Sequence, residues 1–198
     1  VSDRYPLGFE EFHTEYFTIN ERLWEQIRDG EIDKDYLRKH RFYDSFLFFG
    51  IDDFELAQTF ENNFLDEILN HNDLVEGAFE ILEYLSNKKY KLHILSNGFK
   101  EVTYKKCELS GIKNYFQTIT SADEINIRKP HPEVYDYALK KAGAKTEESM
   151  MIGDDWIADI EGGKACGLEV VFLDVFNDNF EADGVKTIKK LKELETLL

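Results

Sequence analysis

Cysteine is scarce in this chain, and so are long apolar runs. The two cysteines, Cys107 and Cys166, lack the spacing of metal-ligand pairs, which argues against a disulfide framework or a cysteine metal site. We interpret them as reduced thiols packed in helices, as expected of a cytoplasmic protein. No apolar run approaches transmembrane length, and the amino-terminal residues show no signal-peptide pattern.

Positive charge is also in short supply. The chain has 24 lysines and arginines against 40 aspartates and glutamates, a net charge of −16. Such an excess disfavours nucleic acid polymers and anionic membranes as partners, because both require positive surface. A phosphate site in this protein therefore needs local positive charge, from a metal ion or a well-placed lysine. The 198 residues, 42% of them hydrophobic, suffice for one domain or for one core with a modest insertion.

The sequence changes character near residue 73. Before it, apolar and aromatic residues recur at three- and four-residue spacing, which predicts helices over about 9–28, 33–48 and 53–70. Residues 1–72 are thus expected to form a small helical bundle with an aromatic core. The positions predicted to point inward are Phe9, Phe12, Tyr16, Ile19, Leu23, Ile27, Phe54, Ala57, Phe60, Phe64, Leu65 and Ile68.

After residue 73, helical and strand patterns alternate. Helices are expected over 74–88, 100–109, from Pro132 to Ala142, over 156–166 and over 187–198; strands are expected over 91–95, 117–120, 149–152 and 169–173. This alternation predicts an α/β fold with a parallel sheet covered by helices on both faces. Right-handed crossovers then bring the carboxyl ends of the strands to one edge.

The most informative segment follows the third of these strands. There an apolar run ends in Gly153-Asp154, and Asp159 follows one turn into the next helix. Glycine allows a sharp turn at the strand end, where open α/β folds bind their ligands. Two carboxylates at that place suit a hard cation such as Mg²⁺. An ordinary turn followed by a helix cap is the alternative interpretation.

Two further segments end neighbouring βα units. Ser96-Asn97-Gly98 can hold a phosphate oxygen through a hydroxyl and backbone N–H groups, although the same residues also form common turns. Lys129 is followed by Pro130, His131 and Pro132, and the fixed loop makes it a candidate phosphate clamp, although a loop lysine is usually solvated. Their order along the chain with Gly153-Asp154 is more specific than any one of the three.

Taken in that order, these segments resemble the second, third and fourth motifs of the haloacid dehalogenase (HAD) superfamily of phosphatases. The resemblance implies a Rossmann-like parallel sheet core in residues 73–198 and an inserted helical cap in residues 1–72. The segments Asn20–Trp24 and Leu95–Phe99 look most like the pyrimidine 5′-nucleotidase branch.

The resemblance also implies roles for individual residues. Ser96, Asn97 and Gly98 would bind the transferring phosphoryl group, and Lys129 would neutralise the phosphate and the nucleophile as a catalytic residue. Asp154 would bind Mg²⁺, with Asp159 supporting the ion directly or through water. The substrate would be a small phosphorylated metabolite, and the protein a monomer or homodimer.

One motif of the family is absent from these 198 residues. It is an apolar strand ending in Asp-x-Asp-x-Thr, whose first Asp is the covalent nucleophile. The similar run Val170–Phe176 follows the fourth motif and has Phe176 in place of the second Asp, so we reject it as the nucleophile. The first core strand is therefore expected to be missing here, leaving a gap in the sheet.

These observations support two main hypotheses. The first is a Mg²⁺-dependent phosphatase acting through an aspartyl-phosphate, with the nucleophile outside these residues and a nucleoside monophosphate as one candidate substrate. The alternative is a catalytically inactive phosphate-binding or regulatory protein. A third, weaker hypothesis is a helical interaction protein built around residues 1–72.

Overall fold

The computed structural model describes residues 5–198, so the first four residues of the predicted cap lie outside the described residues. The chain separates into two units, one ending at His71 and the other beginning at Asn72. Within residues 5–198 no helix is both long enough and apolar enough to cross a membrane.

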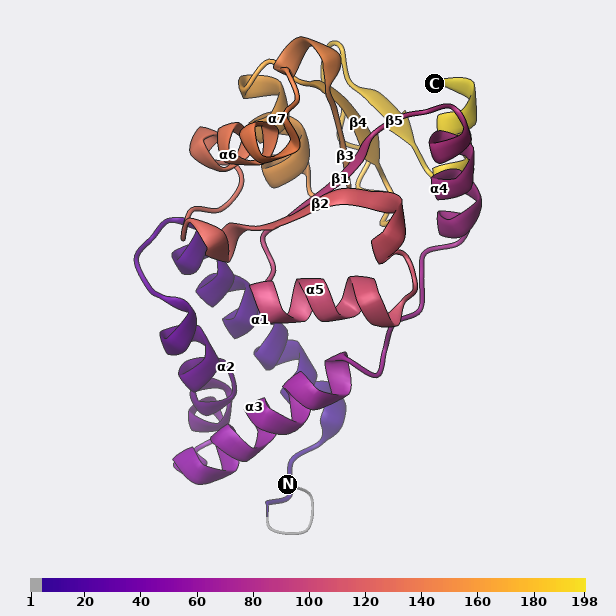
Figure 1. Ribbon diagram of the computed structural model, residues 1–198. Helices are drawn as coiled ribbons and strands as arrows, with labels where there is room; N and C mark the ends of the chain where they lie inside the picture. The colour runs from indigo at the N-terminus through magenta and orange to yellow at the C-terminus, as the bar shows by residue number, and fades with distance from the viewer. Residues whose placement is uncertain (1–4) are drawn as a thin grey trace. The chain divides into compact units, whose positions relative to one another are not determined.

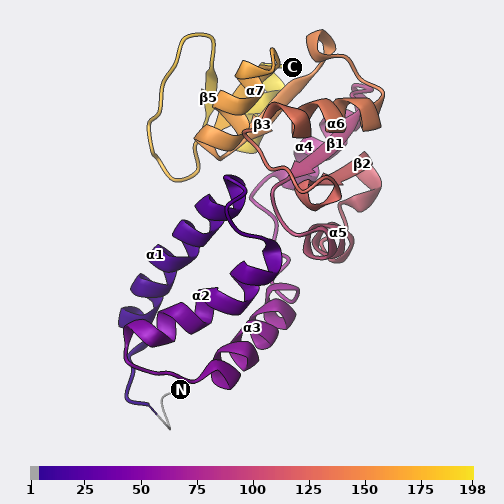
Figure 2. The same ribbon diagram turned by 90° about the vertical axis from the view of Figure 1, so that its left-hand side faces the viewer.

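The first unit consists of three helices, α1 (Phe9–Arg28), α2 (Lys34–Phe48) and α3 (Phe54–Ile68) (Figure 2). Aspartates begin the second and third. The Asp33 carboxylate accepts the Tyr36 N–H at 2.7 Å, and Asp53 accepts the Leu56 N–H at 3.0 Å. Each bond satisfies a backbone donor that has no partner within the helix. The three helices fall within two residues of the predicted bounds.

Aromatic rings fill the interior of this unit. Phe46 is fully buried and lies 5.2 Å from the ring of Phe12, while Tyr16 stacks on Phe42 at 4.9 Å. The prediction that Phe9 and Phe54 point inward was wrong, because Phe9 is 72% exposed and Phe54 is 45% exposed. Both are the first residue of their helix, where no preceding turn helps to cover the side chain.

A buried ion pair joins α2 to α3. Arg41 donates to both carboxylate oxygens of Glu61, at 2.6 and 2.8 Å, and the two residues are only 4% and 2% exposed. Arg38 adds a third bond to Glu61 at 3.3 Å, and the Arg41 guanidinium lies 4.5 Å from the centre of the Phe64 ring. Charges removed from water in this way depend on their partners, since an unpaired buried charge is costly.

Replacing Glu61 with alanine leaves the Arg41 guanidinium buried without its partner. We expect Glu61→Ala to lower the free energy of unfolding by about 3–5 kcal/mol in a urea titration. Glu55→Ala, an exposed change on the same helix, serves as the control and should cost less than about 1 kcal/mol. Similar losses in both variants would contradict a dominant role for the buried pair.

The second unit alternates helices and strands (Figure 1). Its regular elements are α4 (Ala78–Asn87), β1 (Leu92–Ser96), α5 (Lys100–Leu109), β2 (Phe116–Ser121), α6 (Pro132–Ala142), β3 (Met150–Gly153), α7 (Gly162–Ala165), β4 (Glu169–Leu173) and β5 (Lys186–Ile188). Short 3₁₀ helices span Lys113–Tyr115, Ala122–Glu124, Thr146–Glu148 and Leu191–Thr196. The unit has the predicted α/β fold.

Three predicted elements differ from the structure. The helix predicted over 74–88 begins only at Ala78, because Gly77 before it has a left-handed backbone. Residues 187–198 do not form one helix: Ile188 is the buried end of strand β5, and a 3₁₀ helix follows. The helix predicted over 156–166 is a π-helical turn, Trp156–Glu161, followed by the short α7. At Gly162 an added Cβ would overlap the Tyr135 hydroxyl, so the backbone there packs closer than ordinary helix side chains allow.

All strand pairs are parallel, but they form two sheets, β1-β2 and β3-β4-β5. Among the described residues, β1 pairs only with β2, and β3 only with β4 and not with β1. The residues of β1 and β3 are all half-buried, whereas Val170, Val171 and Phe172 of β4 are buried. The described strands therefore form two separate parallel sheets, with no pairing between β1 and β3.

Helices cover both faces of the three-stranded sheet. Val171 and Ile188 pack with Ile81 and Leu85 of α4, and the neighbouring β4 residues Val170 and Phe172 pack with Ile160 on the other face. This alternation follows from the two-residue period of a strand. Ser96, Ser121, Gly153 and Leu173 are the last residues of their strands. Because paired strands are parallel, the carboxyl ends within each sheet lie at the same edge.

Candidate active site

Most of the predicted site residues lie where strands end, and Lys129 lies in a loop. Ser96 is the last residue of β1, with Asn97 and Gly98 directly after it. Asp154 follows β3 directly, and Asp159 lies in the π-helical turn after it. Lys129 lies in the loop before α6, where its peptide bond to Pro130 is cis.

Lys129 brings the three segments together. Although it is a lysine, it is only 6% exposed. Its Nζ donates to the carbonyl of Leu95 on β1 at 3.2 Å and pairs with the Asp159 carboxylate beyond β3. The Lys129 ammonium therefore connects the ends of the two strands that do not pair with each other.

The Asn97 side chain fixes the backbone of that lysine. Its Oδ1 accepts the Lys129 N–H at 2.8 Å, and its Nδ2 donates to the Lys129 carbonyl at 2.9 Å. The amide group thus pairs with both polar groups of one residue. From sequence alone Asn97 was expected to contribute its backbone N–H to phosphate, and the positioning of Lys129 is a further role that spacing does not reveal.

Asp159 is 4% exposed, and both of its carboxylate oxygens are engaged. One pairs with Lys129, and the other accepts the Asp155 N–H at 3.1 Å. Gly153 is required by this arrangement, because a Cβ added there would overlap the Asp159 carboxyl group. These contacts favour an indirect role for Asp159 at a metal ion, and its direct coordination stays a prediction.

Ser96 is held by the predicted Gly98 and by Thr103, which the sequence did not single out. Its Oγ accepts the Gly98 N–H at 3.0 Å and the Thr103 hydroxyl at 3.4 Å. Ser121, which pairs with Ser96 in the β1-β2 register, donates to the Gly98 carbonyl at 2.8 Å. A serine at the same end of the neighbouring strand is the signal that could have identified Ser121.

Tyr135 is a second residue that the sequence analysis missed. It is 1% exposed, its hydroxyl donates to the carbonyl of Ala158, and burial raises its pKa. A tyrosine that stays protonated remains a donor, so this bond holds α6 against the turn that carries Asp159. In the sequence, the only signal for Tyr135 is its position on the apolar face of the helix predicted from Pro132 to Ala142.

Asp154 presents an exposed carboxylate next to this buried network. Partial desolvation raises its pKa, and the charges of Asp159 and Asp155 add to the effect, while Lys129 opposes it. A cation beside Asp154 would relieve this cost. The Asp155 side chain is less available, since it caps the following turn by accepting the Ala158 N–H at 2.8 Å.

Within residues 5–198, no group of three or more acidic, histidine or cysteine side chains is placed to hold a metal ion. Magnesium usually binds through one or two carboxylates, with water and substrate phosphate completing its six ligands. Asp154 as a direct ligand, with Asp159 behind it, is compatible with a magnesium ion that takes only one or two ligands from the protein. The described residues alone do not supply enough ligands to complete the coordination of a magnesium ion.

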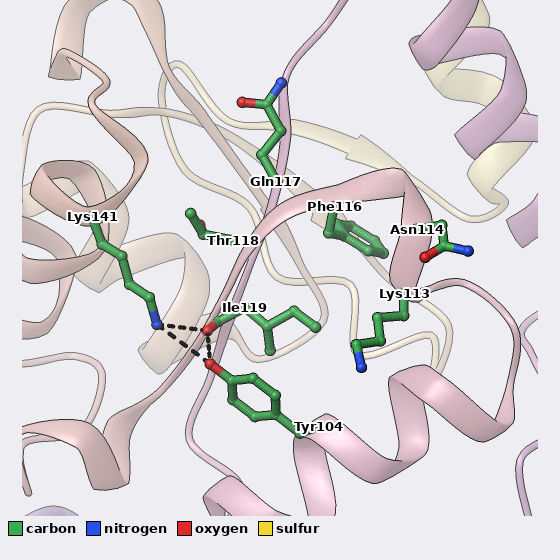
Figure 3. A pocket seen from close by; sticks show the side chains of 8 residues that line it. All are labelled: Tyr104, Lys113, Asn114, Phe116, Gln117, Thr118, Ile119 and Lys141. Carbon is green, nitrogen blue, oxygen red and sulfur yellow. Dashed lines mark hydrogen bonds between the residues drawn. The ribbon is translucent and has the colours of Figure 1, made fainter.

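A pocket of about 440 Å³ lies elsewhere, along β2 (Figure 3). None of the predicted site residues lines it; its lining residues are Tyr104, Lys113, Asn114, Phe116, Gln117, Thr118, Ile119 and Lys141. Both lysines already have acidic partners, Lys141 with Glu124 at 2.7 Å and Lys113 with Glu108 at 3.6 Å. The pocket therefore lies apart from the residues assigned to the candidate site.

Known proteins resemble this chain over nearly its whole length. A model of the haloacid dehalogenase-like hydrolases matches residues 19–173. The HAD-hydrolase YfnB of Bacillus subtilis (strain 168) is 29% identical over 188 residues, covering 93% of this chain and 78% of that protein. The pyrimidine 5′-nucleotidase YjjG of Escherichia coli (strain K12) is 28% identical over 188 residues, covering 93% and 81%.

The fold agrees with these relatives. The crystal structure of YfnB from Bacillus subtilis, bound to magnesium, superposes with a TM-score of 0.83 at 25% identity, covering 100% of this chain and 86% of that one. A dehalogenase superposes with a TM-score of 0.76 at 20% identity, which supports the fold alone.

Substitution of Gly153 tests the geometry of the site. In Gly153→Ala the new methyl group displaces Asp159 and breaks its pair with Lys129. We therefore expect the free energy of unfolding to fall by at least about 3 kcal/mol. The control is Gly8→Ala, because Gly8 has a negative φ of −72° and nothing within 4 Å of an added Cβ. Unchanged thermal unfolding of Gly153→Ala would contradict the close approach.

Proposed function

The chain belongs to the haloacid dehalogenase-like hydrolase family, and on that premise we propose that it acts in the Mg²⁺-dependent hydrolysis of a small phosphomonoester. The observation that carries this proposal is the buried ammonium of Lys129, held between the ends of β1 and β3. In a chain of net charge −16, a fixed cation at a strand edge is the local positive charge that phosphate binding needs.

The surrounding residues would share the work of phosphate binding. Ser96 would bind a phosphoryl oxygen through its hydroxyl, with help from the Asn97 N–H, and Lys129 would neutralise the charge of the phosphate and of the nucleophile. Asp154 would hold Mg²⁺, with Asp159 in support, and the ion when bound would supply further positive charge to the phosphoryl oxygens. Catalysis of phosphoryl transfer rests mainly on such positioning and electrostatic stabilisation.

The nucleophile would come from outside these 198 residues. The described side chains at the site include no activated nucleophile, and the separation of the strands into two sheets supports a place for one more strand. Among the described residues, β1 and β3 each have one edge without a paired strand, and the free N–H and C=O groups of such an edge can pair with a further strand. An apolar strand pairing with both would bring an aspartate at its carboxyl end next to Lys129, for reaction through an aspartyl-phosphate.

A nucleoside monophosphate is the substrate that we favour. YjjG and PynA, the latter from Streptococcus pneumoniae (strain ATCC BAA-255 / R6) and 28% identical over 160 residues, are both named pyrimidine 5′-nucleotidases. Relatives with enzyme names do not favour the alternative of an inactive phosphate-binding protein. The net charge of −16 keeps nucleic acid polymers out of the proposal.

An extended chain tests this proposal. We would add an apolar strand ending in Asp-x-Asp-x-Thr before residue 1, confirm the intact mass, and measure hydrolysis of p-nitrophenyl phosphate with and without Mg²⁺. We expect turnover only with the added strand and the metal ion. Replacing the first added Asp by Asn, or making Asp154→Asn in the extended chain, should lower the rate by at least about 10²-fold.

Two results would contradict the proposal. One is an extended chain that is folded but hydrolyses no phosphomonoester in the presence of Mg²⁺. The other is full activity in the extended chain after Asp154→Asn. The matched control is Asp52→Asn, an exposed aspartate of the first unit, which should retain the activity of the extended parent.

A further inference from the structure

Beside the candidate site, apolar side chains project from the two segments that follow β3 and β4. Ile157 is 48% exposed, Phe176 72% and Phe180 46%. Gly153 and Phe172 are paired in the parallel register of β3 and β4, so both segments leave the sheet at the same edge. Asp154 leaves from that edge as well, two residues before Trp156.

Stacked rings support this apolar surface. Trp156 lies 5.2 Å from Phe180 with the rings 27° from parallel, and its edge meets buried Phe172 at 5.1 Å and 82°. The indole Nε1 donates to Glu161 at 2.9 Å, which fixes the rotation of the ring. Phe180 therefore packs against Trp156, which itself contacts the buried Phe172, although nearly half of Phe180 remains exposed.

The loop that carries Phe176 and Phe180 is held in place by a buried aspartate. Asp174, 2% exposed, accepts the N–H groups of Asp178 and Asn179 at 2.8 and 3.3 Å. Lys189 on the far side of the loop donates to the Asn177 side chain at 2.8 Å. These bonds fix the backbone around the two phenylalanines, so their exposure is a feature of an ordered loop.

We infer that Trp156, Ile157, Phe176 and Phe180 form an aromatic wall that binds the planar base of a nucleoside monophosphate whose phosphate lies at Lys129. This rests on the proposed function. The net charge of −16 opposes an anionic substrate, so contacts to its uncharged part have to contribute to affinity. Aromatic faces suit this purpose because they stack on any flat ring with little loss of side-chain freedom.

The test compares three ligands by calorimetry on the 198-residue chain: inorganic phosphate, ribose 5-phosphate and uridine monophosphate. We expect the uridine monophosphate to bind more tightly than ribose 5-phosphate. In the Phe176→Ser/Phe180→Ser variant its affinity should fall about tenfold, the effect of losing one stacked base, with the other two ligands unchanged. Phe9→Ser and Phe79→Ser, equally exposed at 72% and 46%, are the matched controls and should not change any affinity.

A second measurement does not use the Phe176→Ser/Phe180→Ser variant, so it does not depend on the folding of that variant. In the Trp24→Phe background, Trp156 is the remaining tryptophan, and its fluorescence should be quenched by uridine monophosphate but not by ribose 5-phosphate. Equal affinities for these two ligands in the parent chain, without quenching, would overturn the aromatic wall and leave the phosphate site standing. Failure of all three ligands to bind would overturn the phosphate site and the wall together.

Discussion

The pairing of Lys129 with Asp159 is the interaction on which the site depends. It joins a loop after one sheet to a turn after the other, and it is buried, so neither charge has water as a substitute partner. Asn97 fixes the backbone of the lysine, Gly153 makes room for the carboxylate, and Tyr135 holds the turn beside it. Each of these residues serves the placement of one ammonium group in an acidic protein.

Much of this architecture could be predicted from the sequence, because strands and helices alternate with clear periods and the site residues follow strand ends. The α/β fold and the bounds of most elements were confirmed, α5 and α6 to the residue. Strand β5 was missed because its three residues continue into a pattern of apolar positions that also fits a helix. Its pairing with β4 is a long-range contact that local periodicity does not contain.

The site was predictable in part for the same reason. Residue types at strand ends indicated Ser96, Lys129, Asp154 and Asp159, but spacing does not show which groups pair. The engagement of both Asp159 oxygens, and the supporting roles of Thr103 and Ser121, depend on contacts between residues up to 30 positions apart in the chain. Family resemblance suggested the chemistry, and the buried ammonium gives it a physical basis in this chain.

The outer edges of the two sheets, at β2 and β5, are less open to pairing with another strand than the edges at β1 and β3. On the outer strand β2, the Ile119 carbonyl is already occupied by the Tyr104 hydroxyl at 2.6 Å and the Lys141 ammonium at 2.8 Å (Figure 3). At the opposite end, β5 is only three residues long and begins with a lysine. Pairing with a strand of a neighbouring molecule is thus discouraged at both outer edges, whereas β1 and β3 keep backbone groups without a strand partner among the described residues.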